Sequence, residues 1–265
     1  MSRYYTITPE GMSIDVKKLS QDVTLFFAIP TYKETKSEFT QCLMMLDGFL
    51  AVRGIRRKTH FHRGDSVPDL ARNMCVAEFL KSGCTHMMFL DDDIHFAKDD
   101  VLRYLALDVD VVGGNYGKKY LFWDKILSAV RFCPEFDTMP DEDAIRMMQH
   151  AGVEMTAKTK PGGKQMDKLV EADRLPGGFL MIKRTVFERI MAARPDIHFT
   201  TGHSEDAINP YLFAFFRHVV QDGQWLGEDY YFSELCQACG ITIWKDTEAQ
   251  LAHIGTYVFT GDPAA

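Results

Sequence analysis

Three consecutive aspartates, Asp91, Asp92 and Asp93, directly follow the apolar run formed by residues 85–90. That run is short, bounded and rich in Met, Phe and Leu, which is typical of a buried strand. The carboxylates should therefore emerge at the carboxyl end of a strand, the edge where open α/β sheets bind ligands. Two charges at about 4 Å repel by roughly 4 kcal/mol at an effective dielectric of about 20. A divalent cation would remove that repulsion, and Mg²⁺ or Mn²⁺ prefers carboxylate oxygens.

Two other interpretations of the acidic triplet are weaker. A solvated acidic turn is the common outcome for such a sequence, but the position directly after a buried strand favours a metal site. A calcium-binding EF-hand loop is excluded by its spacing. Counting from Asp91, the sixth residue is Phe96 and the twelfth is Leu102, where that loop requires Gly and Glu.

The chain alternates between strand-like and helix-like patterns, above all in its first half. This alternation predicts an α/β protein with a mostly parallel sheet, right-handed crossovers and flanking helices. A capping-box pattern at residues 66–69 is expected to open one helix, which ends at Gly83. Strands are expected at residues 23–29, 57–63, 85–90, 109–112, 126–132, 178–183 and 241–244, and the other helices at residues 38–52, 98–107, 185–193 and 228–238.

A single domain is expected over residues 23–261, after an N-terminal extension of residues 1–22. The sequence contains neither internal repeats nor a Pro- or Ser-rich linker that would divide it. Residues 134–174 are polar and include the stretch Lys-Thr-Lys-Pro-Gly-Gly-Lys. We interpret this segment as an insertion or a mobile loop.

Bulk composition limits the classes of partner. The chain has 265 residues, of which 46% are hydrophobic and 25% charged, as in ordinary soluble globular proteins. Its formal charge of −7 gives no overall attraction to nucleic acid or to an anionic membrane. Residues 53–63 are a local exception with five cations, and they form either a solvated edge strand or a surface for a polyanion. Without a secretory signal or a membrane-spanning stretch, a cytoplasmic protein with no membrane contact is expected.

Two features belong with the aspartates on the ligand-binding side. Pro30, Thr31 and Tyr32 leave the carboxyl end of the first expected strand, where a loop can hold a nucleobase and ribose through backbone groups and the Tyr32 ring. Arg72 lies early in the helix that the capping-box pattern at residues 66–69 opens, and its guanidinium geometry suits a phosphate or a base carbonyl. Each signal is weak alone, because an isolated helical Arg is more often a surface residue.

Two further features could complete a reactive site. Glu228 and Asp229 open a helix, where carboxylates stabilise the N-terminus, and one of them could instead take a proton from an incoming hydroxyl. His253 follows a late strand-like segment. A lone His is usually structural, but a neutral imidazole is also a common ligand of divalent metals.

In this order, the motifs resemble those of GT-A glycosyltransferases, especially short family 2-like chains without an anchor that are common in viruses of bacteria and algae. The resemblance covers roughly residues 23–261. It rests on the Pro-Thr-Tyr loop, the Ala-Arg-Asn helix start, Phe-Leu-Asp-Asp-Asp as an Asp-x-Asp motif, Gly-Gly-Phe-Leu-Met-Ile-Lys-Arg, Gly-Glu-Asp and His-Ile-Gly. It implies a Rossmann-like GT-A fold, with residues 23–117 as the nucleotide-sugar half and residues 175–261 as the acceptor and catalytic half.

The same resemblance implies a metal-dependent transfer of a hexosyl or pentosyl group from a nucleoside-diphosphate sugar, with a UDP-sugar as the first choice. Asp91 would contact the ribose and would belong, with Asp93 and His253, to the set that holds Mn²⁺ or Mg²⁺. Asp92 could support either role. The metal would stabilise the charge that develops on the departing nucleoside diphosphate.

The remaining roles are also implied by the resemblance. Asp229 would be the general base and Glu228 would orient the acceptor, which favours inversion at the anomeric carbon. Gly177 and Gly178 would let the chain approach the donor sugar closely. Lys118, or the lysine that follows it, could assist the diphosphate.

Several alternatives stay open at this point. The acceptor hydroxyl could belong to a glycan, to a small molecule or to a hydroxymethylated pyrimidine in phage DNA. A nucleotide-sugar-binding protein without turnover and a nucleotidylyltransferase are rival functions, although the loop after the first strand lacks the glycines of the latter class. A glycoside hydrolase would use paired carboxylates without a metal, which the contiguous aspartates make less fitting. Homodimer formation is not decided by the sequence.

Overall fold

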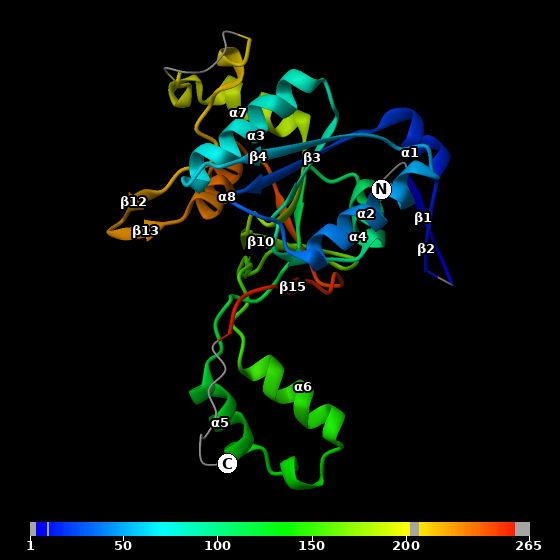
Figure 1. Cartoon of the computed structure of the whole chain (residues 1–265), viewed down its shortest axis with the longest axis vertical. Coiled ribbons are helices and arrows are strands. Elements are labelled where there is room, and N and C mark those ends of the chain that lie inside the picture. Colours follow the sequence, from blue (N-terminus) through cyan, green and yellow to red (C-terminus); the bar gives the residue numbers. More distant parts are fainter. Residues whose placement is uncertain (1–3, 10, 202–206, 258–265) are drawn as a thin grey trace.

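A computed structural model of the chain describes residues 4–9, 11–201 and 207–257. Within these residues a nine-stranded sheet forms the centre of the molecule (Figure 1). Its strands follow the spatial order β4-β3-β5-β11-β7-β14-β10-β8, and β9 pairs with β10. In chain order they are β3 (Thr24–Thr31), β4 (Arg56–Arg63), β5 (His86–Leu90), β7 (Val111–Gly113), β8 (Lys158–Thr159), β9 (Gln165–Met166), β10 (Leu169–Arg174), β11 (Phe179–Lys183) and β14 (Ile243–Asp246).

Most strands of this sheet run in one direction. β4, β3 and β5 are mutually parallel, and β7 is parallel to β14. β11 lies between β5 and β7 and is antiparallel to both, so β5 and β7 share one direction. β10 opposes its neighbours β14, β8 and β9. The predicted α/β class, with a mostly parallel Rossmann-like sheet as expected for a GT-A fold, is confirmed.

Helices cover both faces of the sheet, and each face has its own hydrophobic core. Alternate residues of β3 enter the two cores: Phe26 faces α3, α7 and α8, whereas Phe27 faces α1, α2 and α4. Burial on both faces explains why the central strands are continuously apolar. The helices are α1 (Val16–Asp22), α2 (Ser37–Ala51), α3 (Pro68–Ser82), α4 (Lys98–Leu107), α5 (Trp123–Phe132), α6 (Asp141–Ala151), α7 (Arg184–Ala193) and α8 (Glu228–Ala238).

Three two-stranded ribbons accompany the central sheet, and each has a local role. β1 (Tyr5–Thr8) and β2 (Gly11–Ile14) form a hairpin in the N-terminal extension, which packs onto the body through the buried Tyr4 and Leu19. The other two ribbons pair β6 (Ile94–His95) with β15 (Ala252–His253) and β12 (Val219–Gln221) with β13 (Gln224–Leu226). The limits 1–3 of the expected extension and 258–261 of the expected domain lie outside the described residues.

The structure corrects two local predictions. Residues 126–132 were expected to form a strand but belong to α5, because Ile126, Leu127 and Val130 also suit one face of a helix. The expected capping box at residues 66–69 does not form. Val67 is the N-cap, without a side-chain bond, and Pro68 starts the helix.

The segment at residues 134–174 was expected to be an insertion or a mobile loop, and the mobile-loop alternative is wrong because the segment forms regular secondary structure. It contains α6 and three strands, and β10 joins the central sheet beside β14. The polar composition reflects the exposure of α6, which buries no residue. β10 is recognisable only through its two buried positions, Leu169 and Ala172. Among the described residues, no helix is long and apolar enough to cross a bilayer.

Candidate active site

A pocket of about 310 Å³ opens at the carboxyl ends of β3 and β5. It collects residues that are far apart in the sequence, from the loop after β3 to the strand β15. Nine of the sequence-predicted site residues line it: Pro30, Thr31, Tyr32, Arg72, Asp91, Asp92, Asp93, Glu228 and His253. Asp65, Pro68 and Ala71 complete the lining.

Arg72, on α3, bonds the carboxylates of Asp91 after β5 and of Glu228 at the start of α8. Its side chain is only 8% exposed. Nη1 and Nη2 donate to the two carboxylate oxygens of Asp91 at 3.1 and 2.9 Å, and Nε donates to Oε1 of Glu228 at 3.3 Å. Burial alone would lower the pKa of Arg72, but the charges of Asp91 and Glu228 outweigh it and raise that pKa. One buried cation therefore pairs with two carboxylates that line the pocket.

The two predicted glycines lie directly behind these charges. A Cβ on Gly177 would come within 2.7 Å of the Arg72 guanidinium carbon. A Cβ on Gly178 would come within 2.5 Å of the Tyr116 hydroxyl and 2.8 Å of Asp91. The Gly178 N–H also donates to that hydroxyl at 2.9 Å. Both glycines thus leave room for the side chains of the site to pack against the backbone.

Asp93 and His253 face each other at the pocket. Oδ1 of Asp93 lies 3.4 Å from Nε2 of His253, and Nδ1 of His253 lies 2.9 Å from the carbonyl oxygen of Gly117. Because a carbonyl only accepts hydrogen bonds, we place the ring proton on Nδ1, as in many metal-ligating histidines. Nε2 then faces the carboxylate of Asp93, so the two groups are placed to share a proton or a cation. The other oxygen of Asp93 forms an ion pair with Lys119.

The electrostatics of the aspartate triplet differ along its length. Burial opposes the ionisation of Asp93, but hydrogen bonds with His253 and Lys119 outweigh it and lower the pKa of Asp93. Burial and the neighbouring Asp93 charge raise the pKa of Asp92. The donor set of carboxylate oxygens and one imidazole nitrogen suits Mn²⁺ or Mg²⁺. Asp91, the third expected ligand, already has both oxygens bound by Arg72.

Asp229 is close to the pocket but is not one of its lining residues. It lies in the first turn of α8, beside Glu228, and its Oδ1 accepts a hydrogen bond from the Tyr230 N–H at 2.8 Å. Burial, followed by the charge of Glu228, raises the pKa of Asp229 to about 6. A carboxylate with a pKa near neutrality is well suited to exchange protons at physiological pH.

A group that the sequence did not indicate stands behind Glu228. The His218 backbone N–H donates to Oδ2 of Asp69 at 2.7 Å, and Nδ1 lies 2.6 Å from Oδ1 of the same carboxylate. On the other side of the ring, Nε2 lies 3.4 Å from Oε2 of Glu228. One ligand atom from each of Asp69, His218 and Glu228 lies within 4.8 Å of the others, so the group has the composition of a metal site. Since the two carboxylates contact opposite ring nitrogens, the imidazole bridges them.

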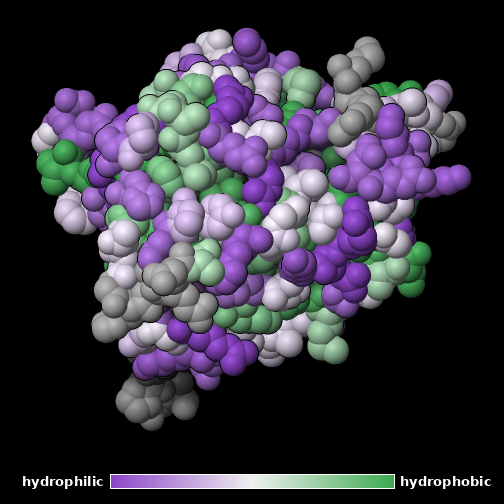
Figure 2. Space-filling view, turned by 90° about the horizontal axis from the view of Figure 1, so that it is seen from above, coloured by the Kyte–Doolittle hydropathy of each residue, from purple (hydrophilic) through white to green (hydrophobic). Residues whose placement is uncertain are grey.

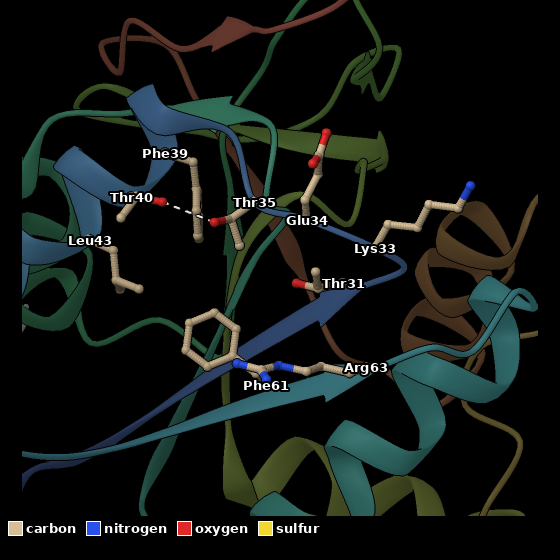
Figure 3. A pocket seen from close by; sticks show the side chains of 9 residues that line it. All are labelled: Thr31, Lys33, Glu34, Thr35, Phe39, Thr40, Leu43, Phe61 and Arg63. Atoms are coloured by element: carbon tan, nitrogen blue, oxygen red, sulfur yellow. Dashed lines mark hydrogen bonds between the residues drawn. The ribbon is translucent and has the colours of Figure 1, made fainter.

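Lys118 and its neighbour have different surroundings. Lys118 pairs with Glu154 at 3.0 Å, whereas Lys119 pairs with Asp93. A second cavity, of about 450 Å³, lies on the other side of the loop after β3. Figure 3 shows its walls, with Thr31 and Arg63 at the strand ends and a Thr35–Thr40 hydrogen bond of 3.0 Å between the loop and α2.

No protein-family model matches the sequence, and the comparison with curated proteins gives no match either. Among solved structures, the chain is similar to the crystal structure of GalNAc-T7 with UDP, GalNAc and Mn²⁺, with 10% sequence identity and a TM-score of 0.46. That similarity covers 88% of this chain but 44% of the other, so the chain spans less than half of that protein's length. So distant a likeness assigns neither residue roles nor an activity here. The proposals below therefore rest on the side chains of this pocket.

Proposed function

We propose that the chain is a metal-dependent glycosyltransferase that moves a sugar from a nucleoside-diphosphate sugar to an acceptor hydroxyl. The observation that carries this proposal is the approach of Asp93 and His253 to 3.4 Å in the pocket that the Pro30–Tyr32 loop also lines. A carboxylate and an imidazole nitrogen that face each other at this distance are suited to share a cation. The loop, in which Tyr32 is 57% exposed, would supply a surface for the nucleoside.

Binding of the donor diphosphate would use the cationic side of the pocket. Asp93 and His253 would hold Mn²⁺ or Mg²⁺, and Asp91 could contribute if it shares its bond with Arg72. When bound, the ion would supply charge stabilisation for the leaving nucleoside diphosphate. Lys119, already beside Asp93, is the lysine whose position supports contact with a phosphate oxygen. Arg72 would keep Asp91 and Glu228 fixed while the donor binds.

Proton transfer would fall to the carboxylates at the start of α8. We propose Asp229 as the general base, because its pKa of about 6 leaves it ionised at neutral pH yet able to accept a proton. Glu228, held between Arg72 and His218, would orient the acceptor. A single base acting on the acceptor hydroxyl supports inversion at the anomeric carbon.

The acceptor would approach from the side of β12 and β13. Trp225 on this ribbon is 72% exposed, and its ring lies 5.4 Å from the His218 ring, centroid to centroid. An exposed indole can stack on a sugar or on an extruded base. A glycan or a small molecule fits the net acidity of the chain better than DNA does.

A modified base in phage DNA remains the second acceptor candidate because of the basic β4 edge strand. In that strand Arg57 pairs with Asp47 at 2.5 Å, and Lys58 bonds the carbonyl oxygen of Ser82 at 2.9 Å. The double variant Arg56→Glu/Arg57→Glu should weaken transfer to hydroxymethylated DNA in a salt-dependent way and leave transfer to a free sugar unchanged. Equal rates on DNA would exclude this acceptor.

The decisive experiment is a donor screen. The purified chain is incubated with a panel of UDP-, GDP- and TDP-sugars and Mn²⁺, thermal shift reports binding, and release of the nucleoside diphosphate reports turnover. Metal-dependent release from one donor, lost in Asp93→Ala, supports the proposal. Binding without release would identify a nucleotide-sugar-binding protein, and pyrophosphate-dependent formation of a nucleoside triphosphate would identify a nucleotidylyltransferase.

A further inference from the structure

Residues 118–157 form a helical hairpin that stands away from the rest of the molecule. In Figure 1 its helices α5 and α6 lie below the central sheet, and two neighbouring connecting segments join them to it. Neither helix contains a buried residue. Within the described residues, this segment holds seven of the seventeen exposed large hydrophobic side chains: Tyr120, Leu121, Trp123, Leu127, Phe132, Ile145 and Met155.

The hairpin packs against itself only along an inner seam. A Cβ on Gly152 would come within 2.7 Å of Ile126, and one on Gly117 would meet Val153, so both glycines allow the two arms to approach closely. The backbone N–H of Phe122 donates to the Gly152 carbonyl at 2.9 Å. This seam leaves the larger apolar side chains outside it.

We call the side of the hairpin away from this seam its outer face, and among the described residues several large apolar side chains stay exposed there. Trp123 is 59% exposed, Leu127 48% and Phe132 84%. By contrast, hydrophilic and hydrophobic residues are interspersed on the opposite end of the molecule, seen from above in Figure 2. Two short helices do not bury enough apolar surface to be stable alone, and most helical stability comes from packing of the apolar face. A partner for this face would supply that packing.

The charges of the two helices indicate which partner fits. On α5, Lys125 and Arg131 outnumber Asp124, whereas α6 opens with residues 141–143, Asp-Glu-Asp, against the single cation Arg146. The acidic start of α6 would be repelled by an anionic membrane. A two-fold axis, however, can bring α5 of one copy against α6 of another, where the opposite charges attract.

We propose that the outer face of the hairpin is a dimer interface, at which two copies of the chain pair about a two-fold axis as a four-helix bundle. The exposed apolar side chains of α5, together with Ile145 of α6, would form its centre, as in other antiparallel bundles. The basic flank of α5 lies beside the acidic start of the partner's α6. This inference is independent of the transferase proposal, because it concerns the mass of the full chain in solution.

The first test measures the mass of the full chain by sedimentation equilibrium over a range of concentrations. The unaltered chain should sediment at twice its own mass, and Leu127→Glu should weaken the dimer by at least about 100-fold, because it buries a charge in the interface. Met44→Glu, on the exposed side of α2, is the matched control and should leave the dimer intact. A monomeric unaltered chain, or a dimer that Leu127→Glu does not weaken, would overturn the proposal.

Charge exchange tests the orientation of the pairing. Lys125→Glu/Arg131→Glu makes both helices acidic, and Asp141→Lys/Asp143→Lys makes both basic, so each variant alone should dimerise more weakly. An equimolar mixture should recover a heterodimer with the affinity of the unaltered chain. A mixture that stays monomeric contradicts the pairing of α5 with the partner's α6. Co-flotation of the chain with phosphatidylserine vesicles as a monomer would instead assign the face to membranes and also reject the dimer.

Discussion

The pocket at the sheet edge and the α5–α6 hairpin differ in how far their side chains find partners among the described residues. At the pocket, Arg72 is shared by Asp91 and Glu228, and Asp93 is shared by His253 and Lys119. Each of these charges has a counter-charge within the chain. The hairpin instead leaves large apolar side chains in solvent, and neither of its helices buries a residue.

The two regions therefore differ in the kind of interaction that they can still form. The pocket is fixed by paired charges among its own side chains, and the proposed cation would bind between Asp93 and His253. The hairpin lacks packing area, which only a large surface can supply. Substitutions in the pocket should therefore change chemistry, whereas substitutions on the hairpin should change association. The following predictions test that separation, in order of decreasing effect.

The largest effect is expected for Asp93→Ala. Removing this carboxylate takes away the group that faces His253 and pairs with Lys119, so the metal site loses its main oxygen ligand. Transfer measured with Mn²⁺ should fall by about 10³-fold, because the ion contributes several kcal/mol of charge stabilisation. Calorimetry should show that Mn²⁺ binding is lost as well.

Asp99→Ala is the matched control for this variant, because Asp99 is an exposed acid on α4 that pairs with Lys98. It should leave both Mn²⁺ binding and transfer unchanged. Full activity of Asp93→Ala, or of the unaltered chain in excess EDTA, would show that transfer needs no metal. It would also contradict the proposal that substitutions in the pocket change chemistry through the metal site.

The next largest effect is expected for Asp229→Asn, which should lower kcat by about 10²-fold through loss of the base. Donor affinity, measured by calorimetry, should be retained. The kcat of the unaltered chain should rise with pH as Asp229 ionises, with an apparent pKa of about 6. A pH-independent kcat, or an unimpaired variant, would exclude Asp229 as the base.

The same substitution should lower kcat but raise the free energy of unfolding at neutral pH. The pKa of Asp229 is raised in the folded chain, from 3.8 to about 6, so the folded state binds the proton more tightly than the unfolded state does. Stability from this group is complete below about pH 4 and is lost as the pH rises to about 6. Above pH 6 the neutral Asn variant should be more stable, by up to about 3 kcal/mol. Chemical denaturation at pH 5 and pH 8 measures the difference.

The sequence predicted much of the fold because periodic apolar patterns persist where packing is regular. The helices expected at residues 98–107 and 228–238 have those limits, and the strand expected at residues 178–183 differs by one residue. The strand prediction for residues 126–132 was wrong because a short apolar run suits a strand or a helix equally. Its helical state is favoured by packing against α6, which the local sequence does not show. The mobile-loop alternative for residues 134–174 was wrong for a related reason, since α6 has no buried residue that would make its helical pattern clear.

The candidate site divides in the same way. Asp91, Asp92 and Asp93 were identifiable because they follow a buried strand, a local signal. The approach of His253 depends on two residue pairs between β15 and β6, which no local pattern specifies. The Asp69–His218 contact joins residues 149 positions apart, and it was hidden by the apparent capping role of Asp69. Long-range pairings of polar side chains carry no periodic signal, so the sequence could not show them.

Two leucine substitutions, one in the core and one on the hairpin, test by their effect on the free energy of unfolding whether the hairpin side chains are packed. Leu180 on β11 is 1% exposed, so Leu180→Ala should lower the free energy of unfolding by about 2–5 kcal/mol. Leu127→Ala, on the outer face of the hairpin, should change it by less than about 0.5 kcal/mol at dilute, monomeric concentrations. Urea denaturation of both variants gives the two values. Similar losses would mean that the hairpin is packed within its own chain.

The smallest effect is expected where the two regions meet, at Lys119. This lysine lies at the base of the hairpin, yet its side chain pairs with Asp93 in the pocket. Since the pair is partly exposed, Lys119→Ala should raise the KM for the donor by only about two- to five-fold. Lys118→Ala should have a weaker effect, because Lys118 pairs with Glu154 instead. Steady-state kinetics of the two variants at equal Mn²⁺ decide the matter: a larger KM change in Lys118→Ala would move the phosphate contact to Lys118, and a change of dimer mass in Lys119→Ala would show that the hairpin and the pocket are coupled.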